Sequence, residues 1–279
     1  MSLDPTVSEW LNLFARWFHV FAGILWIGST YYFTWLDGQF TEAKDESAAQ
    51  VWMVHSGGFY VVEKRKSLSV LPRDLHWFRW EAALTWLSGA FLLTLMFYLG
   101  GGSGLVDKDV LDISGVTALA VGIGAIIFGL LLYELMWWSI FPFILKKRSE
   151  RLEMEFALVA YLLIVAFALI LTHILSGRAA YIHIGAMFGT IMAANVWLHI
   201  LPAQKKMIAA IEKGEKPDAR LAAQAKMRSK QNTFTIVPVV FLMISNHYAA
   251  ATYGSNYNWL VLSVLILVGW GAAKIIRRA

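Results

Sequence analysis

The sequence contains no cysteine among its 279 residues. This absence excludes disulfide bonds, zinc–thiolate sites, iron–sulfur clusters and c-type haem, which is attached through a Cys-x-x-Cys-His motif. Any metal or prosthetic group must therefore be held by histidine, carboxylate, methionine or backbone groups.

A basic amino-terminal region is also missing. The chain begins MSLDPTVSEW and runs directly into a long apolar stretch, whereas a secretory signal peptide starts with a positively charged segment. We therefore expect no cleavable signal peptide.

Charged residues are scarce and hydrophobic residues abundant, at 15% and 58% of the chain, and the mean hydropathy is +0.56. About seven apolar segments are long enough to cross the hydrocarbon layer of a bilayer. The sequence predicts an all-α integral membrane protein, one membrane domain over residues 1–279 formed by a bundle of about seven transmembrane helices. The predicted spans are Leu11–Leu36, Trp77–Leu99, Gly115–Leu145, Phe156–Leu175, Tyr181–Leu201, Phe234–Thr252 and Trp259–Ile276.

The distribution of lysine and arginine predicts the orientation. These residues are concentrated in the connections after the first, third and fifth spans, whereas the opposite connections carry only Lys108 and Arg178. Because basic loops stay in the cytoplasm, we expect the N-terminus outside and the C-terminus inside. The basic cytoplasmic loops explain the formal net charge of +5, and they would be attracted to anionic lipid headgroups. The expected partner is the lipid bilayer, and nucleic acid is not expected.

Two cytoplasmic stretches are not predicted to span the membrane. In the loop 37–76, the pair Gly57–Gly58 lies between two β-prone runs and predicts a small hairpin. Residues 203–233 are predicted to form an amphipathic connector that is interrupted from Gly214 to Pro217. Its apolar residues are expected to face the membrane: Met207, Ile208 and Ile211.

Four of the seven histidines fall in the outer half of the membrane, on different predicted spans. An ionisable residue in a span is costly and usually faces the bundle interior, a water-filled cavity or a cofactor. Each histidine alone could simply bond to a neighbouring helix. Four at one depth favour a metal or b-type haem instead, because imidazole is the ligand that suits haem iron. The candidate ligands are His19, His173, His183 and His247.

Neighbouring residues strengthen this hypothesis for His19. Gly23 lies one turn away and could leave room for the edge of a porphyrin, although small residues also permit close helix packing. Arg16 and Arg178 lie near the outer surface, where they could pair with haem propionates. The alternative for both arginines is that they reach the lipid headgroups.

A second polar level is predicted near the inner surface. His76 and His199 could hold a second haem there or line a cavity for a substrate. Glu134 is the most deeply placed acid of the spans and should either pair with an arginine such as Arg79 or relay protons. Satisfied ion pairs at the membrane interface would explain the same residues.

The loop histidine His55 is expected to be accessible from the cytoplasm. Together with Lys64 and Arg65 it could bind an anionic or planar ligand. A histidine beside a Gly–Gly pair can also be no more than a turn residue.

Three segments carry a resemblance to a known family: HVFAGILWIGSTYYFTWLD (19–37), VWMVHSGGFYVVEKRK (51–66) and LHWFRWEAALTWLSGAFLL (75–93). They resemble the membrane domain of the bacterial membrane-bound urate oxidase, or urate hydroxylase, family. The resemblance implies a multi-pass protein of the bacterial inner (cytoplasmic) membrane with a role in purine catabolism, and in that membrane the outward N-terminus predicted from the loops would be periplasmic. The implied reaction oxidises urate to 5-hydroxyisourate and passes the electrons to a c-type cytochrome.

Urate is a planar anion, so its site should combine cations, aromatic faces and a base. The predicted catalytic residues are His55, His76 and Glu134. Binding groups are expected from Lys64, Arg65 and Arg79, with Trp77 and Trp80 beside them.

The chain departs from the family pattern in one respect. Family members typically continue into a further span and a periplasmic cytochrome c domain, and this sequence contains neither. We therefore expect a separate cytochrome c as the electron acceptor. The alternative is a non-catalytic, haem-binding electron-transfer or structural subunit of a larger membrane complex. A transporter using the same polar residues is less favoured, because the two halves show no inverted repeat.

Overall fold

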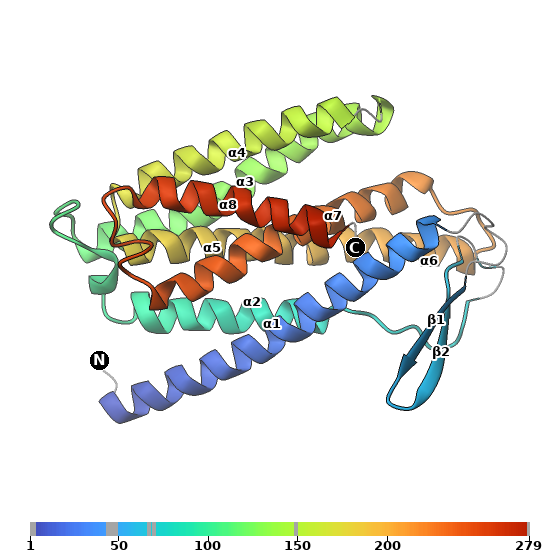
Figure 1. Ribbon diagram of the computed structural model, residues 1–279, viewed down its shortest axis with the longest axis horizontal. Coiled ribbons are helices and arrows are strands. Elements are labelled where there is room, and N and C mark those ends of the chain that lie inside the picture. Colours follow the sequence, from blue (N-terminus) through green and yellow to red (C-terminus); the bar gives the residue numbers. More distant parts are fainter. Residues whose placement is uncertain (1–3, 43–49, 66–67, 69–70, 148–149, 278–279) are drawn as a thin grey trace.

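The computed structural model describes residues 4–42, 50–65, 68, 71–147 and 150–277. These residues form a bundle of long helices lying side by side, with one small β-hairpin at an end (Figure 1). The helices are α1 (Pro5–Glu42), α2 (Trp80–Leu93), α3 (Gly115–Lys147), α4 (Glu150–Thr172), α5 (Gly177–Ala194), α6 (Leu201–Glu212), α7 (Ala219–Ile244) and α8 (Asn258–Ile276).

Four short helical segments complete the chain path. The π-helical segments η1 (Thr94–Tyr98) and η3 (Asn195–Ile200) continue α2 and α5 without a break, and η3 leads directly into α6. Two 3₁₀ turns, η2 (Ser103–Leu105) and η4 (Ser245–His247), lie in the connections that follow η1 and α7.

Six helical segments of the described chain are long and apolar enough to cross a membrane: Pro5–Phe40, Trp80–Tyr98, Gly115–Ser139, Arg151–Thr172, Gly177–Glu212 and Asn258–Ile276. The all-α, multi-pass character predicted from the sequence is therefore confirmed. Which end of the bundle faces the cytoplasm stays a prediction.

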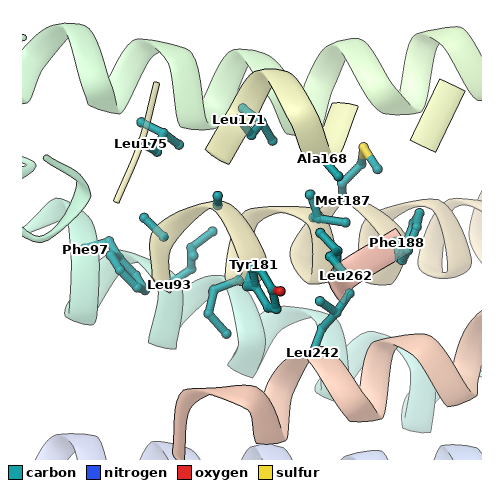
Figure 2. Close-up of a cluster of buried hydrophobic side chains, with 14 of the residues drawn as sticks. Leu93, Phe97, Ala168, Leu171, Leu175, Tyr181, Met187, Phe188, Leu242 and Leu262 are labelled. Carbon is teal, nitrogen blue, oxygen red and sulfur yellow. The ribbon is translucent and has the colours of Figure 1, made fainter. Parts of the chain in front are cut away.

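Helix α5 is the central element of the bundle. It contacts α2, α3, α4 and α7, and its side chains Tyr181, His183 and Ile184 are fully buried. Figure 2 shows Tyr181, Met187 and Phe188 of α5 surrounded by side chains from the neighbouring helices. The bundle core therefore forms around one helix.

Helix α1 is peripheral by comparison. It packs mainly along α2, with a smaller contact to α7, and its aromatic residues are largely exposed, including Trp10, Phe14 and Trp17. In a membrane this face would lie against lipid.

The predicted sixth span and the connector before it differ from the structure. The interruption from Gly214 to Pro217 is present, since α6 ends at Glu212 and α7 begins at Ala219. However, α7 runs unbroken from the predicted connector into the predicted span, and it ends at Ile244 instead of Thr252. Its first half is too polar to be recognised as a span, yet α7 packs beside α5 and α8. Polar residues are tolerated there because they are paired inside the protein.

The hairpin predicted around Gly57–Gly58 is confirmed. Strands β1 (Gln50–His55) and β2 (Gly58–Glu63) pair antiparallel. The two connecting residues, Ser56 and Gly57, have φ values of 51° and 76°, as a two-residue turn of a twisted hairpin requires. Residues 43–49, 66–67 and 69–70 of the predicted loop 37–76 lie outside the described residues.

Candidate functional site

A cavity of about 1090 Å³ lies between α1, the segment before α2, α6 and α7. This volume is slightly above the usual range for small-molecule sites, about 300–1,000 Å³. Three walls are helical, and the fourth is formed by described residues between β2 and α2. The residues that line it come from distant parts of the sequence, from Trp26 to Arg277.

Cations dominate the charge of this cavity. Among the described residues, its lining has five lysine or arginine side chains against one carboxylate, Asp37. The five are Lys64, Arg65, Lys226, Lys230 and Arg277. This excess of positive charge favours an anionic ligand.

Three of these cations are held by contacts with neighbouring residues. Lys64 forms an ion pair with Asp37, and Lys230 Nζ lies 2.7 Å from Glu153 Oε2. Arg277 Nη1 donates a hydrogen bond of 3.2 Å to Thr233 Oγ1, and its guanidinium lies over the ring of Phe234.

Arg65 is held differently. It donates two hydrogen bonds to the Glu63 carboxylate, which together with its charge lower the pKa of Glu63.

Aromatic side chains form much of the remaining wall: Trp26, Phe33, Trp35, Trp77 and Phe78. The imidazole of His76 also lines the cavity and meets the Phe78 ring edge-on, with 4.6 Å between centroids. Cations beside aromatic faces, with one imidazole within reach, suit a planar anion that must lose a proton.

The predicted binding patch is only partly brought together. Lys64, Arg65, His76 and Trp77 line the cavity. His55 does not, because it ends β1 and is exposed at the hairpin turn.

Two further predicted binding residues pair with each other outside the cavity lining. Arg79 lies over the ring of Trp80, with its Cζ 5.5 Å from the centroid.

The apolar residues Met207, Ile208 and Ile211 were predicted to face the membrane, but they line the cavity, because α6 packs against α7.

A buried ion pair lies behind the cavity. Arg228 of α7 donates from Nη1 and Nη2 to the two carboxylate oxygens of Glu134 on α3, both at 2.9 Å. His199, in the π-helical segment η3, approaches the same carboxylate with its Nε2 at 3.0 Å. The Arg228 side chain is 4% exposed and that of Glu134 28%. The carboxylate is therefore held by two cationic or donor groups from two other helices.

The surroundings of Arg228 compensate for its burial. Its guanidinium lies 5.1 and 4.4 Å from the ring centroids of Tyr133 and Trp137, distances typical of cation–π contacts. Nη1 also donates to Asn195 Oδ1 at 2.9 Å.

This network reaches the cavity through Asn232. The Nδ2 of Asn195 donates to Asn232 Oδ1 at 2.8 Å, and Asn232 lines the cavity. A continuous chain of hydrogen bonds thus joins the cavity to Glu134.

Glu134 does pair with an arginine, which is one of the two roles predicted for it, but the arginine is not the one named as the example. The sequence suggested Arg79, whereas the structure pairs Glu134 with Arg228, which lay in the predicted surface connector. The spacing of Arg228 and Asn232, four residues apart on the face of a helix that leads into an apolar run, was a usable signal. Glu134 itself does not line the cavity among the described residues.

On the other half of the bundle, His19 is anchored to α2. Its Nδ1 lies 3.0 Å from the Thr85 carbonyl oxygen and 3.0 Å from Ser88 Oγ. The ring packs on Gly89, where an added Cβ would lie 2.9 Å from His19 Cε1. Within the described residues, His19 Nε2 has no hydrogen-bond partner. A histidine held through Nδ1 with Nε2 available is the arrangement of a metal ligand.

His183 has a different environment. It is fully buried, its Nδ1 lies 2.8 Å from the Ala179 carbonyl oxygen, and its Nε2 lies 2.9 Å from the hydroxyl of Tyr98. Its ring packs on Gly122 of α3. Both ring nitrogens are thus used within the bundle.

The remaining outer histidines are exposed at helix ends. His173 follows α4 and its Nδ1 lies 2.7 Å from the Leu169 carbonyl oxygen, and His247 lies in η4. His19 contacts Ser88 of α2, and His183 contacts Tyr98 of η1. These two positions are about 15 Å apart along the helix that α2 and η1 form together.

The four outer histidines therefore do not gather. Among the residues that the structure describes, no group of three or more His, Asp or Glu side chains could share a metal ion.

The two outer arginines do come together. Arg16 donates to Asn12, and its Nη2 lies 3.1 Å from Met96 Sδ. Arg178 donates to Asn246 Oδ1 at 2.8 Å and lies over Phe97.

The two arginines thus contact adjacent residues of η1, and neither forms an ion pair with a described carboxylate. Such a pair of cations favours an anion between them.

Gly23 faces α2, where an added Cβ would lie 3.9 Å from Thr85 Cγ2.

Comparison with known proteins places the chain in a family. A model of the urate oxidase N-terminal family matches residues 5–277, so the chain belongs to that family. A comparison with curated proteins gave no match, and neither did a comparison with solved structures. The family assignment agrees with the resemblance carried by the three segments quoted above.

Proposed function

We propose that this member of the urate oxidase N-terminal family oxidises urate in the cavity between α1, α6 and α7. The observation that carries the proposal is the lining of this cavity, in which five cations and five aromatic rings surround a space of about 1090 Å³. Urate is a flat monoanion at neutral pH, so it can stack on the rings while its oxygens accept hydrogen bonds from the cations.

Three cations are proposed to bind the anion. Lys226 and Arg277 approach from α7 and from the end of α8, and Lys64 approaches from the end of β2. The excess of positive charge would also raise the local concentration of urate at the entrance. Trp77 and Phe78 offer faces on which the purine can lie.

The reaction requires removal of protons as well as electrons. Urate and water give 5-hydroxyisourate, two protons and two electrons. His76 is proposed to accept a proton, because its imidazole lines the cavity and histidine is the side chain that most often transfers protons in catalysis. Hydrogen bonds through Arg228 and Asn195 connect Glu134 to Asn232 in the cavity wall. Glu134 is proposed to hold this wall in place for the ligand. It is a positioning residue in this proposal.

The electrons need an acceptor that this chain can hold. His19 fits a b-type haem, because its Nδ1 is fixed by α2, its Nε2 is without a partner among the described residues, and glycine lies beneath its ring. Arg16 and Arg178 are suited to the propionates. Bound there, a b-type haem would take up electrons singly for transfer to a separate c-type cytochrome.

The test uses full-length protein in lipid nanodiscs without oxygen. Urate is added to the oxidised protein while its visible spectrum is recorded, and product is measured in the presence of added cytochrome c. We expect a Soret band, its reduction by urate, and formation of 5-hydroxyisourate. Haem that urate fails to reduce would favour a non-catalytic electron-transfer subunit, and a missing Soret band would exclude the haem.

Variants locate the substrate. Lys226→Gln and Arg277→Gln should each raise the urate concentration needed for half-maximal reduction by roughly tenfold, the effect of about 1.4 kcal/mol. Lys216→Gln is the matched control, since Lys216 is an exposed lysine outside the cavity. Equal effects of all three substitutions on this urate concentration would mean that urate binds outside the cavity.

A further inference from the structure

The β1–β2 hairpin has one face that no part of the described chain covers. Its register pairs Trp52 with Val61 and Val54 with Phe59, and these four side chains point to the same side because residues alternate along a strand. They are 67%, 44%, 70% and 81% exposed, respectively. A soluble loop rarely presents such a continuous apolar and aromatic surface.

The opposite face shows where the hairpin sits. Met53 lies on that face, and its Sδ is 3.6 Å from the hydroxyl of Tyr32 on α1. Tyr32 belongs to the candidate membrane span Pro5–Phe40, about 12 Å from the end of that span along the helix axis. Its ring also packs against Phe33 and Trp35. The hairpin is therefore attached to α1 beside a group of aromatic side chains, the residue type favoured at membrane interfaces.

The arrangement in space agrees with this position. Figure 1 shows the hairpin projecting sideways from the bundle beside the end of α1, across the direction of the helices. In a membrane, this direction lies in the plane of the bilayer. A two-stranded hairpin has unpaired backbone groups along both edges, which exclude it from the hydrocarbon centre but not from the hydrated headgroup region.

We propose that the β1–β2 hairpin is an interfacial membrane anchor, with Trp52, Val54, Phe59 and Val61 inserted among the headgroups and upper acyl chains. Tryptophan is favoured at this depth, and the apolar face loses contact with water there. Because β2 leads directly into Lys64 and Arg65, the bilayer would also help to fix these two cations at the cavity. The anchor itself does not depend on the identity of the ligand.

The absence of native cysteine makes the test direct. Val54→Cys and Phe59→Cys are each labelled with a nitroxide and placed in nanodiscs of phosphatidylcholine and phosphatidylglycerol. Collision rates are measured with oxygen, which concentrates in the bilayer, and with a water-soluble nickel chelate. Glu215→Cys, in the exposed segment between α6 and α7, is the matched control.

We expect oxygen collisions to exceed nickel collisions several-fold at positions 54 and 59, and the reverse at 215. Positions 54 and 59 behaving like 215 would overturn the proposal. Low collision rates with both reagents would overturn it as well, because they would mean that protein covers this face. Quenching of a fluorophore on the same cysteines by brominated lipid gives a second measurement that does not rely on the nitroxide.

Discussion

Replacing Arg228 with methionine tests the buried ion pair most directly. The substitution keeps a long side chain but removes two hydrogen bonds to Glu134 and one to Asn195, each of 2.9 Å. It leaves the Glu134 carboxylate with His199 as its remaining donor among the described residues.

The expected loss follows from the burial of the two partners. Breaking a buried pair by removing one member typically costs about 3–5 kcal/mol, because the other charge is left without its partner. Glu134 keeps 28% of its side-chain surface and its contact with His199, so the lower end, about 3 kcal/mol, is expected. Removing both charges in Arg228→Met/Glu134→Leu should recover most of this loss.

The measurement is a double-mutant cycle on the free energy of unfolding in mixed dodecyl maltoside and SDS micelles. A coupling of about 2 kcal/mol or more is expected between the two substitutions. The exposed pair Arg151 and Glu155, one helical turn apart, is the control and should give about 0.3–0.5 kcal/mol. A coupling at Arg228 and Glu134 as small as this control would refute the reasoning.

Three further predictions concern the half of the bundle that is predicted to face outward. Gly122→Ala should destabilise the protein by about 1–3 kcal/mol in the same assay, because its Cβ would lie 2.7 Å from His183 Nε2; Gly189→Ala, with open space around it, should not. Tyr98→Phe should cost about 1 kcal/mol, because it removes the hydroxyl beside His183. Arg16→Gln combined with Arg178→Gln should lower the haem-to-protein ratio of the purified protein, measured from the Soret absorbance, with unchanged haem content counting against the propionate proposal.

The parts of the fold that were predictable depend on local signals. The hairpin was recognised because Gly57 and Gly58 lie between two β-prone runs. The residues with positive φ are one position earlier, Ser56 and Gly57, and Gly58 begins β2. The break near Gly214 was recognised from the same kind of signal, and Gly214 has a φ of 72°. Apolar runs located the spans for an equally local reason, since each must match the thickness of hydrocarbon by itself.

Helix α7 shows where local signals fail. Its amino-terminal half carries Arg228 and Asn232, which lowered its hydropathy and suggested a surface connector. In the structure both are buried, at 3% and 4% exposure, because Glu134 and Asn195 on other helices meet them. The cost of burial is offset by partners more than 30 positions away in the sequence, so composition alone could not reveal it.

The outer histidines show the same limit for the candidate site. His19 and His183 are alike in sequence, since each lies in an apolar run with small residues nearby. They differ in whether the second ring nitrogen, Nε2, has a hydrogen-bond partner. For His183 it is taken by the hydroxyl of Tyr98, which is 85 positions away, whereas His19 Nε2 has no such partner in the described chain. A metal ligand needs one nitrogen held and the other available. Of these two histidines only His19 has that arrangement, and depth in the membrane alone could not separate them.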